Sequence, residues 1–187
     1  MATVDVLFEG YVGDRVAGTV SLVRAGDRVV VVDPGMVPSR AAILDPLAAL
    51  GVAPADVTDV VLSHHHPDHT VNIALFGEDV AVHDHWATYV RDEWRSRPAE
   101  GVELAPGVTL WETAGHTPQD VTTLVETDGG VVALTHLWWS GAIGPDPRAT
   151  DPDALRANRA RVLEVATLLV PGHGAPFAAA NAPTWDG

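Results

Sequence analysis

Short runs of apolar residues dominate the first half of the chain and predict β-strands. Residues 4–10 and 19–25 alternate between apolar and polar side chains, and residues 28–33 form a β-branched run typical of a buried strand. Gly26 and Asp27 stand between the second and third runs and predict a tight turn that joins them as a hairpin. The run at 57–63 predicts a further strand that leads directly into His64.

Helical spacing appears between these strand-like runs. Ala42, Ile43, Leu47 and Leu50 fall on one helical face, and Gly51 provides a stop. Further elements follow along the chain: helices at 70–76, around 86–90 and at 151–166, strands near 80–82, 108–113, 121–127, 130–135 and 167–174, and a loop at 141–152. Strands interleaved with helices predict an α/β layered fold, and we expect one domain over residues 1–187.

Composition fits a folded protein and excludes several kinds of site. Of the 187 residues 47% are apolar and 19% are charged. There is no cysteine, which excludes a disulfide framework, a thiolate nucleophile and an iron–sulfur cluster. Eleven arginines and no lysine stand against 25 carboxylates, and this net charge of -14 disfavours nucleic acid as a partner. Without a secretory signal or an apolar run of membrane-spanning length, we expect a cytoplasmic protein with no membrane association, and a homodimer is left open.

A cluster of histidines indicates metal chemistry. Residues 63–70 read Ser-His-His-His-Pro-Asp-His-Thr. His64 and His66 are two positions apart at the end of a strand and project to one side, whereas His65 points the other way. Asp68 and His69 follow on the turn that enters the next helix. These residues make two half-sites suited to divalent metals, and each half-site needs ligands from elsewhere in the chain.

Three other histidines stand at the ends of predicted elements and are candidates for those ligands. They are His116, His136 and His173. Glycine precedes His116 and His173, which lets the backbone approach a site closely.

Four motifs together resemble the metallo-β-lactamase-fold superfamily. They are Val-Asp-Pro-Gly around Asp33, His-x-His-x-Asp-His at 64–69, the Gly-His at His116, and Pro-Gly-His-Gly at 171–174. The resemblance implies a four-layer αββα sandwich with a metal site at one edge. It implies a first metal held by His64, His66 and His116, and a second held by Asp68, His69 and His173. Asp33 would orient the ligand loop. Two zinc ions are expected, with a single ion, or iron or manganese, left open.

His136 departs from the family pattern. The family normally places an aspartate there, whose carboxylate bridges both metals, whereas a neutral imidazole nitrogen offers one lone pair to one metal. Three arrangements are open: His136 coordinates one metal, it weakens the second position and leaves a single ion, or it swings away from the site. We expect the first.

The resemblance implies a hydrolase. In such a site a metal-bound hydroxide attacks an ester, thioester, lactone or related bond of a small molecule, and Asp68 serves as a catalytic proton carrier. Residues 72–76, 159–166 and 171–177 are similar to the small metallo-β-lactamase domain-containing protein 1-like hydrolases, whose animal members are assigned endoribonuclease activity. The alternatives are therefore a phosphodiesterase or endoribonuclease of the same fold, and a non-hydrolytic mononuclear metal protein because of His136.

For the tryptophans, Asp120 and the histidines outside the ligand set, we expect packing or supporting roles. One of Trp138 and Trp139 should pack in the core and the other should line the pocket. Asp120 is a candidate support for His116. We expect His65 to be structural or exposed, the segment His83-Asp84-His85 to lie at the surface or the pocket rim, and Trp86 and Trp94 to pack in the ordinary way.

Overall fold

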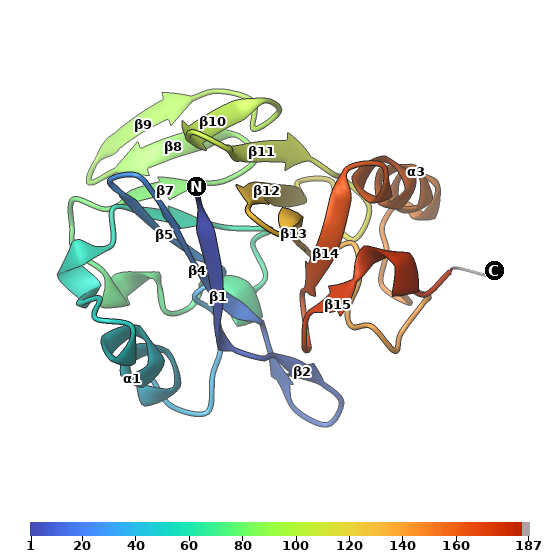
Figure 1. Ribbon diagram of the computed structural model, residues 1–187, viewed down its shortest axis with the longest axis horizontal. Helices are drawn as coiled ribbons and strands as arrows, with labels where there is room; N and C mark the ends of the chain where they lie inside the picture. Colours follow the sequence, from blue (N-terminus) through green and yellow to red (C-terminus); the bar gives the residue numbers. More distant parts are fainter. Residues whose placement is uncertain (185–187) are drawn as a thin grey trace.

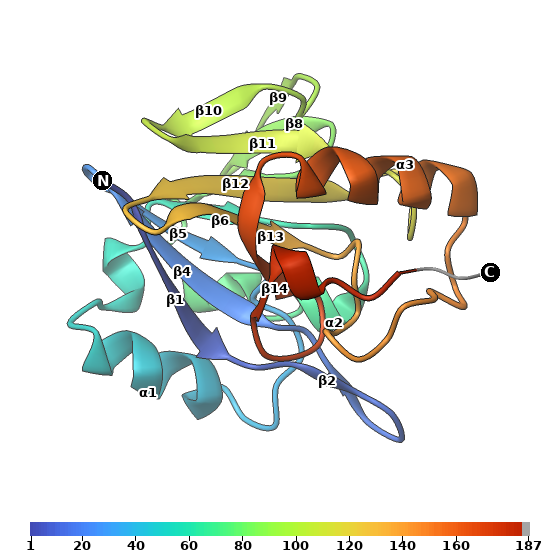
Figure 2. The same ribbon diagram turned by 45° about the vertical axis from the view of Figure 1, so that its right-hand side comes forward.

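Two β-sheets pack against each other, and a helix covers the outer face of each (Figures 1 and 2). The computed structural model describes residues 1–184. The first sheet has the strand order β1 (Thr3–Phe8), β4 (Val20–Ala25), β5 (Arg28–Val32), β6 (Asp59–Val61), β7 (Ala81–His83), β8 (Ala87–Val90) and β9 (Glu93–Ser96). The second has the order β10 (Val102–Ala105), β11 (Val108–Glu112), β12 (Val121–Thr127), β13 (Gly130–Thr135), β14 (Ala166–Pro171) and β15 (Phe177–Ala178).

Few helices complete the fold. The longer ones are α1 (Ala41–Ala49) and α3 (Pro152–Leu163), and α2 (Pro67–Thr70) is a single turn. Short 3₁₀ turns occur at Pro54–Asp56, Ile73–Leu75 and Ala179–Asn181. The strands β2 (Tyr11–Val12) and β3 (Val16–Ala17) form a separate hairpin that projects from the body of the molecule (Figure 2). Within residues 1–184, no helix has the length and apolarity that crossing a membrane requires.

The alternation of side chains along the strands produces the four layers. Val30 and Val32 point into the core between the two sheets, where they meet Leu110 of the second sheet. Val31 points to the other face and packs against Ile43 of α1. The second sheet is covered in the same way, because Leu155 and Val162 of α3 pack on Ala133 and Leu169. The expected αββα sandwich is therefore confirmed.

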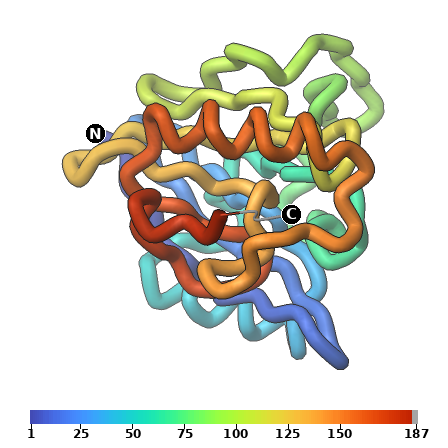
Figure 3. The backbone as a smooth tube through the Cα atoms, turned by 90° about the vertical axis from the view of Figure 1, so that its right-hand side faces the viewer, coloured from blue at the N-terminus to red at the C-terminus, as the bar shows by residue number. Residues whose placement is uncertain are grey.

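Parallel strands bring the functional segments to one edge of the sandwich. Strands β5, β6 and β7 run parallel, so the residues after their carboxyl ends, including Asp33 and His64, lie at the same edge. Strands β13 and β14 are also parallel, and α3 forms the crossover between them. His136 and His173 therefore follow strand ends on the same side of the second sheet. Figure 3 shows α3 crossing this face of the molecule.

The hairpin expected at Gly26 is confirmed, since β4 and β5 pair antiparallel on either side of it and Gly26 has φ +62°. The helix expected around 86–90 is wrong. This segment is β8, which pairs with β7 and β9, and its alternating aromatic and β-branched residues suit a strand. The sequence did not predict β9 or β10. The helix expected at 70–76 is also wrong, because only the single turn of α2 and the short 3₁₀ turn form there.

Two tryptophans do not pack as expected. Trp86, directly before β8, is 46% exposed, and Trp94, on the edge strand β9, is 64% exposed. Their rings make edge contacts, Trp86 with His65 and Trp94 with Tyr89, on the surface of the sheet. The core is complete without them because small β-branched residues fill the space between the sheets.

Candidate metal centre

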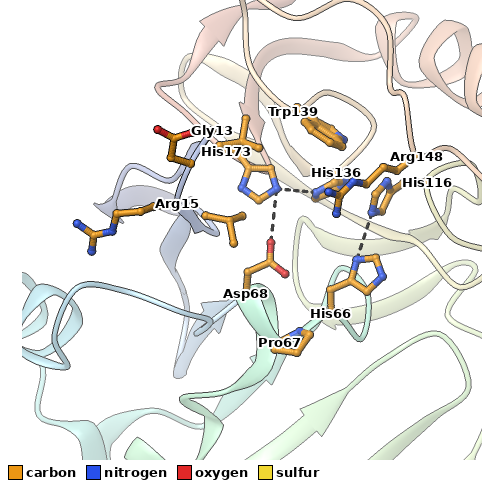
Figure 4. Close-up of a pocket in the computed structure, with 13 residues that line it drawn as sticks. Gly13, Arg15, His66, Pro67, Asp68, His116, His136, Trp139, Arg148 and His173 are labelled. Atoms are coloured by element: carbon orange, nitrogen blue, oxygen red, sulfur yellow. Dashed lines mark hydrogen bonds and ion pairs between the residues drawn. The ribbon is translucent and has the colours of Figure 1, made fainter.

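Six histidines and one aspartate converge at the edge of the sandwich. Figure 4 shows four of these histidines, His66, His116, His136 and His173, together with Asp68. Two buried trios of histidines stand out, and within each trio the ring nitrogens lie within 4.8 Å of one another. One trio is His64, His116 and His136. The other is His69, His136 and His173. His136 belongs to both. All seven residues that the sequence and the family resemblance single out as ligands therefore meet in one place.

The residues of the first expected half-site, His64, His66 and His116, lie together. His66 Nδ1 lies 2.9 Å from His64 Nε2 and 3.2 Å from His116 Nε2. Burial, and then the neighbouring imidazoles, hold the pKa of His64 well below its ordinary value and lower that of His66. The two rings are therefore neutral at physiological pH, and neutral imidazole is the form that binds metals.

The residues of the second expected half-site, Asp68, His69 and His173, also lie together. Asp68 Oδ2 lies 3.4 Å from His69 Nε2 and 3.6 Å from His173 Nε2. Burial opposes the protonation of His69, but the carboxylates of Asp33 and Asp68 outweigh it and raise its pKa to about 9. Burial alone would raise the pKa of Asp68, yet its hydrogen bond with His69 lowers it to about 2. Negative charge therefore gathers around His69, and this charge also favours a divalent cation.

His136 lies between the two half-sites and is buried. Its ring centroid is 4.5 Å from that of His64 and 4.9 Å from that of His69, and its Nε2 lies 3.1 Å from His173 Nε2. Gly172 makes this position available, because a Cβ at that residue would lie 2.3 Å from Cδ2 of His136. The structure thus has His136 directed into the cluster and not swung away from it.

Hydrogen bonds from outside the cluster fix the orientation of its imidazoles. Nδ1 of His69 lies 2.8 Å from Asp33 Oδ2, and the other oxygen of Asp33 accepts a bond from the backbone N–H of Ser63 at 2.7 Å. Nδ1 of His173 donates to the carbonyl of Ala17 at 2.9 Å. Because Nδ1 is engaged in this way, Nε2 of these rings is directed towards the cluster. The orienting role expected for Asp33 agrees with this geometry.

Asp146 is a functional residue that the sequence did not reveal. It is buried in the loop after β13, and its Oδ2 lies 2.8 Å from Nδ1 of His116. The carboxylate accepts from the imidazole and leaves Nε2 of His116 free to face the cluster. The only available signal was an aspartate within a Gly- and Pro-rich loop, which is too common to single out.

A pocket of about 340 Å³ opens above the histidines. The β2–β3 hairpin forms one wall through residues 12–16, and Trp139 and Arg148 form part of the opposite wall (Figure 4). Trp138 is fully buried in the core beside α3. The expectation that one of the two tryptophans packs in the core and the other lines the pocket is therefore confirmed.

Comparison with known proteins identifies the family. The model of the metallo-beta-lactamase superfamily matches residues 13–142, a stretch that includes five of the six clustered histidines. The chain belongs to the metallo-β-lactamase superfamily. Within it, the chain is 35% identical over 189 residues to metallo-beta-lactamase domain-containing protein 1 of Xenopus laevis, an alignment that covers 94% of this chain and 81% of the relative. The protein of the same name from Mus musculus is 38% identical over 158 residues, which are 79% of this chain and 60% of the mouse protein. The chain thus spans about three fifths of that mouse relative.

Solved structures of the superfamily share the fold. A protein of Thermotoga maritima crystallised as a candidate metallo-β-lactamase superposes with a TM-score of 0.73 at 22% identity, covering 95% of this chain and 99% of the other. A protein crystallised in a di-iron-bound form gives 0.69 at 24% identity, with 93% and 96% covered. An N-acyl homoserine lactone hydrolase with its product bound at the catalytic metal centre gives 0.66 at 17% identity, with 92% of each chain covered. At these identities the likeness concerns the fold alone.

Other polar residues singled out in this metallo-β-lactamase chain lie outside the pocket. His65 pairs with Asp84 at 3.0 Å, on the side away from the cluster. His83 is not at the surface or rim as expected, because it is buried and its Nε2 lies 2.8 Å from Asp59. Asp120 accepts the backbone N–H of Thr117 at 2.9 Å, and burial raises its pKa to about 6. It therefore shapes the turn that follows His116 and does not touch the ring.

Proposed function

We propose that this chain is a metal-dependent hydrolase of small-molecule esters, thioesters or lactones. The observation that carries the proposal is the convergence of six imidazoles and a carboxylate beneath a pocket of small-molecule size. We assign His64, His66 and His116 to one zinc ion and Asp68, His69 and His173 to a second, with His136 adding a nitrogen to one of them. The superfamily supports the choice of a hydrolase and of divalent metals.

The donor set fits such ions. Nδ1 of His136 is buried and has no hydrogen-bond partner within the described residues, and Nε2 of His69 is buried with only the carboxylate of Asp68 near it, at 3.4 Å. A buried polar atom without a partner costs about 1–3 kcal/mol, so a cation that accepts its lone pair would relieve that cost. Nitrogen and oxygen ligands in these numbers suit zinc, and they also suit iron and manganese.

The chain's own side chains prepare the reaction. When bound, divalent cations supply Lewis acidity and activate water at neutral pH. Asp68 lines the pocket with its carboxylate beside His69 and His173, and in this position it would accept a proton from water and return it to a leaving group. Asp33 and Asp146 hold their imidazoles in place. Trp139 gives the pocket an apolar wall that restricts water around a bound substrate.

Two considerations guide the choice of substrate class. The fold is shared with a lactone hydrolase, which supports lactones and esters as first probes. The net charge of -14 weighs against RNA, because nucleic-acid binding depends on many phosphate contacts from basic side chains. We therefore place RNA cleavage second and a non-hydrolytic mononuclear metal protein third.

Elemental analysis combined with turnover assays tests the proposal. We expect about two zinc ions per chain, hydrolysis of 4-nitrophenyl acetate and of a simple acyl lactone, and loss of both activities after dialysis against a chelator. The variant Asp68→Asn should lose about a hundredfold or more in kcat, whereas Asp128→Asn, in a distant turn, should retain activity. A single iron per chain without ester or lactone turnover would overturn the proposal. Metal-dependent cleavage of single-stranded RNA with no ester turnover would promote the nuclease.

A further inference from the structure

Most arginines of this acidic chain are engaged with carboxylates or backbone carbonyls, whereas two at the pocket form no ion pair within the described residues. One of these two, Arg15, lies over the ring of Tyr11, 5.9 Å from its centroid. Within residues 1–184, six arginines form ion pairs with carboxylates: Arg24, Arg28, Arg91, Arg95, Arg156 and Arg161. Arg97 and Arg159 donate to backbone carbonyls. Of the others, Arg15 and Arg148 line the pocket above the histidines, and neither lies within ion-pair distance of a carboxylate in the described part of the chain.

The two pocket arginines face different ways. Figure 4 shows Arg148 extending towards His116 and His136, whereas the guanidinium of Arg15 points away from the cluster. Arg15 also follows Asp14, another residue of the pocket wall, so that the charge of the hairpin is locally balanced.

Asp146 fixes the backbone from which Arg148 extends. Its Oδ1 accepts the backbone N–H of Arg148 at 2.8 Å, while its Oδ2 bonds to His116 at 2.8 Å. Each carboxylate oxygen thus has a partner, and no ion pair joins Asp146 to the guanidinium of Arg148 within the described residues. Asp146 therefore holds the candidate metal ligand His116 and also positions the backbone of the positively charged Arg148. The planar guanidinium fork matches the two oxygens of a carboxylate or phosphate.

We propose that Arg148 binds an oxyanion of the substrate, so that the enzyme prefers small esters or lactones carrying a carboxylate or phosphate group. This inference rests on the proposed hydrolase function of the same pocket. The anion lies against Arg148, the apolar part of the substrate contacts Trp139, and the scissile bond lies over the histidines. The absence of lysine from the chain leaves arginine as the side chain for this task.

Three matched esters test the proposal. They are 4-acetoxybenzamide, which is neutral, 4-acetoxybenzoate, and 4-acetoxyphenylphosphonate, all releasing a phenol. We expect the wild type to show a KM about tenfold lower for at least one of the anionic esters than for the amide, and Arg148→Gln to remove this advantage without changing turnover of the amide. The control Arg95→Gln, at an exposed arginine of β9 outside the pocket, should leave the kinetics of all three esters unchanged. Whichever anion benefits more identifies carboxylate or phosphate as the group recognised.

A binding measurement separates the failure of this inference from the failure of the hydrolase proposal. Calorimetric titration of the metal-loaded protein with 4-hydroxybenzoate and 4-hydroxybenzamide requires no turnover. We expect tighter binding of the benzoate than of the benzamide in the wild type and in Arg95→Gln, and equal binding of both compounds in Arg148→Gln. If no ester is hydrolysed but this pattern is observed, only the hydrolase proposal fails. If the esters are hydrolysed with no preference for an anion, or Arg148→Gln weakens neutral and anionic compounds equally, the role of Arg148 is overturned.

Discussion

Asp146 Oδ2 lies 2.8 Å from Nδ1 of His116, and both side chains are buried. A carboxylate in this position holds the imidazole in one tautomer and makes it a stronger ligand. The bond joins the loop after β13 to the loop after β11, so residues 30 positions apart share one interaction. Four predictions follow from contacts of this kind.

The first concerns Asp146 itself. Asp146→Asn should weaken metal binding about ten- to a hundredfold, because the amide can present its N–H₂ to His116 and no longer fixes the ring through a charged acceptor. Competition with a chromogenic chelator measures the affinity. Asp153→Asn, at an exposed position of α3, is the control and should bind metal as the wild type does. Equal affinities of Asp146→Asn and wild type would contradict the role we give this residue.

The second concerns His136, which lies within both trios. His136→Asp introduces a carboxylate with two oxygens, which is able to contact both metal positions. We expect metal content closer to two ions per chain under limiting metal, together with a measurable change in ester turnover. His85→Asp, outside the cluster, serves as the control. Unchanged metal content and unchanged turnover in His136→Asp would show that His136 is not a ligand.

The third concerns Gly172, whose Cβ position lies 2.3 Å from Cδ2 of His136. Gly172→Ala should destabilise the protein by about 1–3 kcal/mol and reduce metal binding, because the methyl group displaces a buried imidazole. Gly129→Ala is a matched control, since its Cβ would lie 3.7 Å from the nearest atom, Oγ1 of Thr127. Urea unfolding gives the stability, and metal titration reports the displacement. A Gly172→Ala protein with full metal affinity would refute the stated contact.

The fourth concerns the pH dependence of a buried network outside the site. Asp59 contacts His83 at 2.8 Å and Arg28 at 3.2 Å. Burial alone would raise the pKa of Asp59, but its hydrogen bonds to His83 and Thr58 outweigh burial and lower the pKa below 3.8. A carboxyl group with a lowered pKa in the folded state contributes stability that is present above its unfolded pKa. That contribution is lost as the pH falls through the folded pKa.

Asp59→Asn should therefore cost about 1–3 kcal/mol at neutral pH, because it removes a charged hydrogen-bond partner. The free energy of unfolding, measured in urea, should differ between wild type and variant by a constant amount from pH 7 to about pH 5, and the difference should shrink below about pH 4. Asp5→Asn removes a half-exposed pair with Arg24 and should have little effect at any of these pH values. A difference that stays constant into acid would contradict the ionised state of Asp59.

Local patterns predicted well those features whose partners are close in the chain. The hairpin at Gly26 depends on a turn and two adjacent runs, and it forms as expected. The segment 86–90 was misread as helical because its strand character is decided by pairing with β7 and β9, and short aromatic and aliphatic runs are ambiguous without that pairing. The exposure of Trp94 could not be predicted for the same reason, since β9 is the edge strand of its sheet.

By itself, the sequence was enough to predict the family, the αββα fold and the seven residues that gather at one edge of the sandwich. It could do so because the 64–69 motif is contiguous, and because the parallel pairing of β5 with β6 and of β13 with β14 brings Asp33, His64, His136 and His173 to the same edge. Only the tertiary structure decided that His136 points into the cluster, that Asp146 orients His116, and that Arg148 faces the pocket while Arg15 turns away. These facts depend on contacts between loops distant in sequence. The direction of a side chain in such loops is set by packing, for which no local pattern exists.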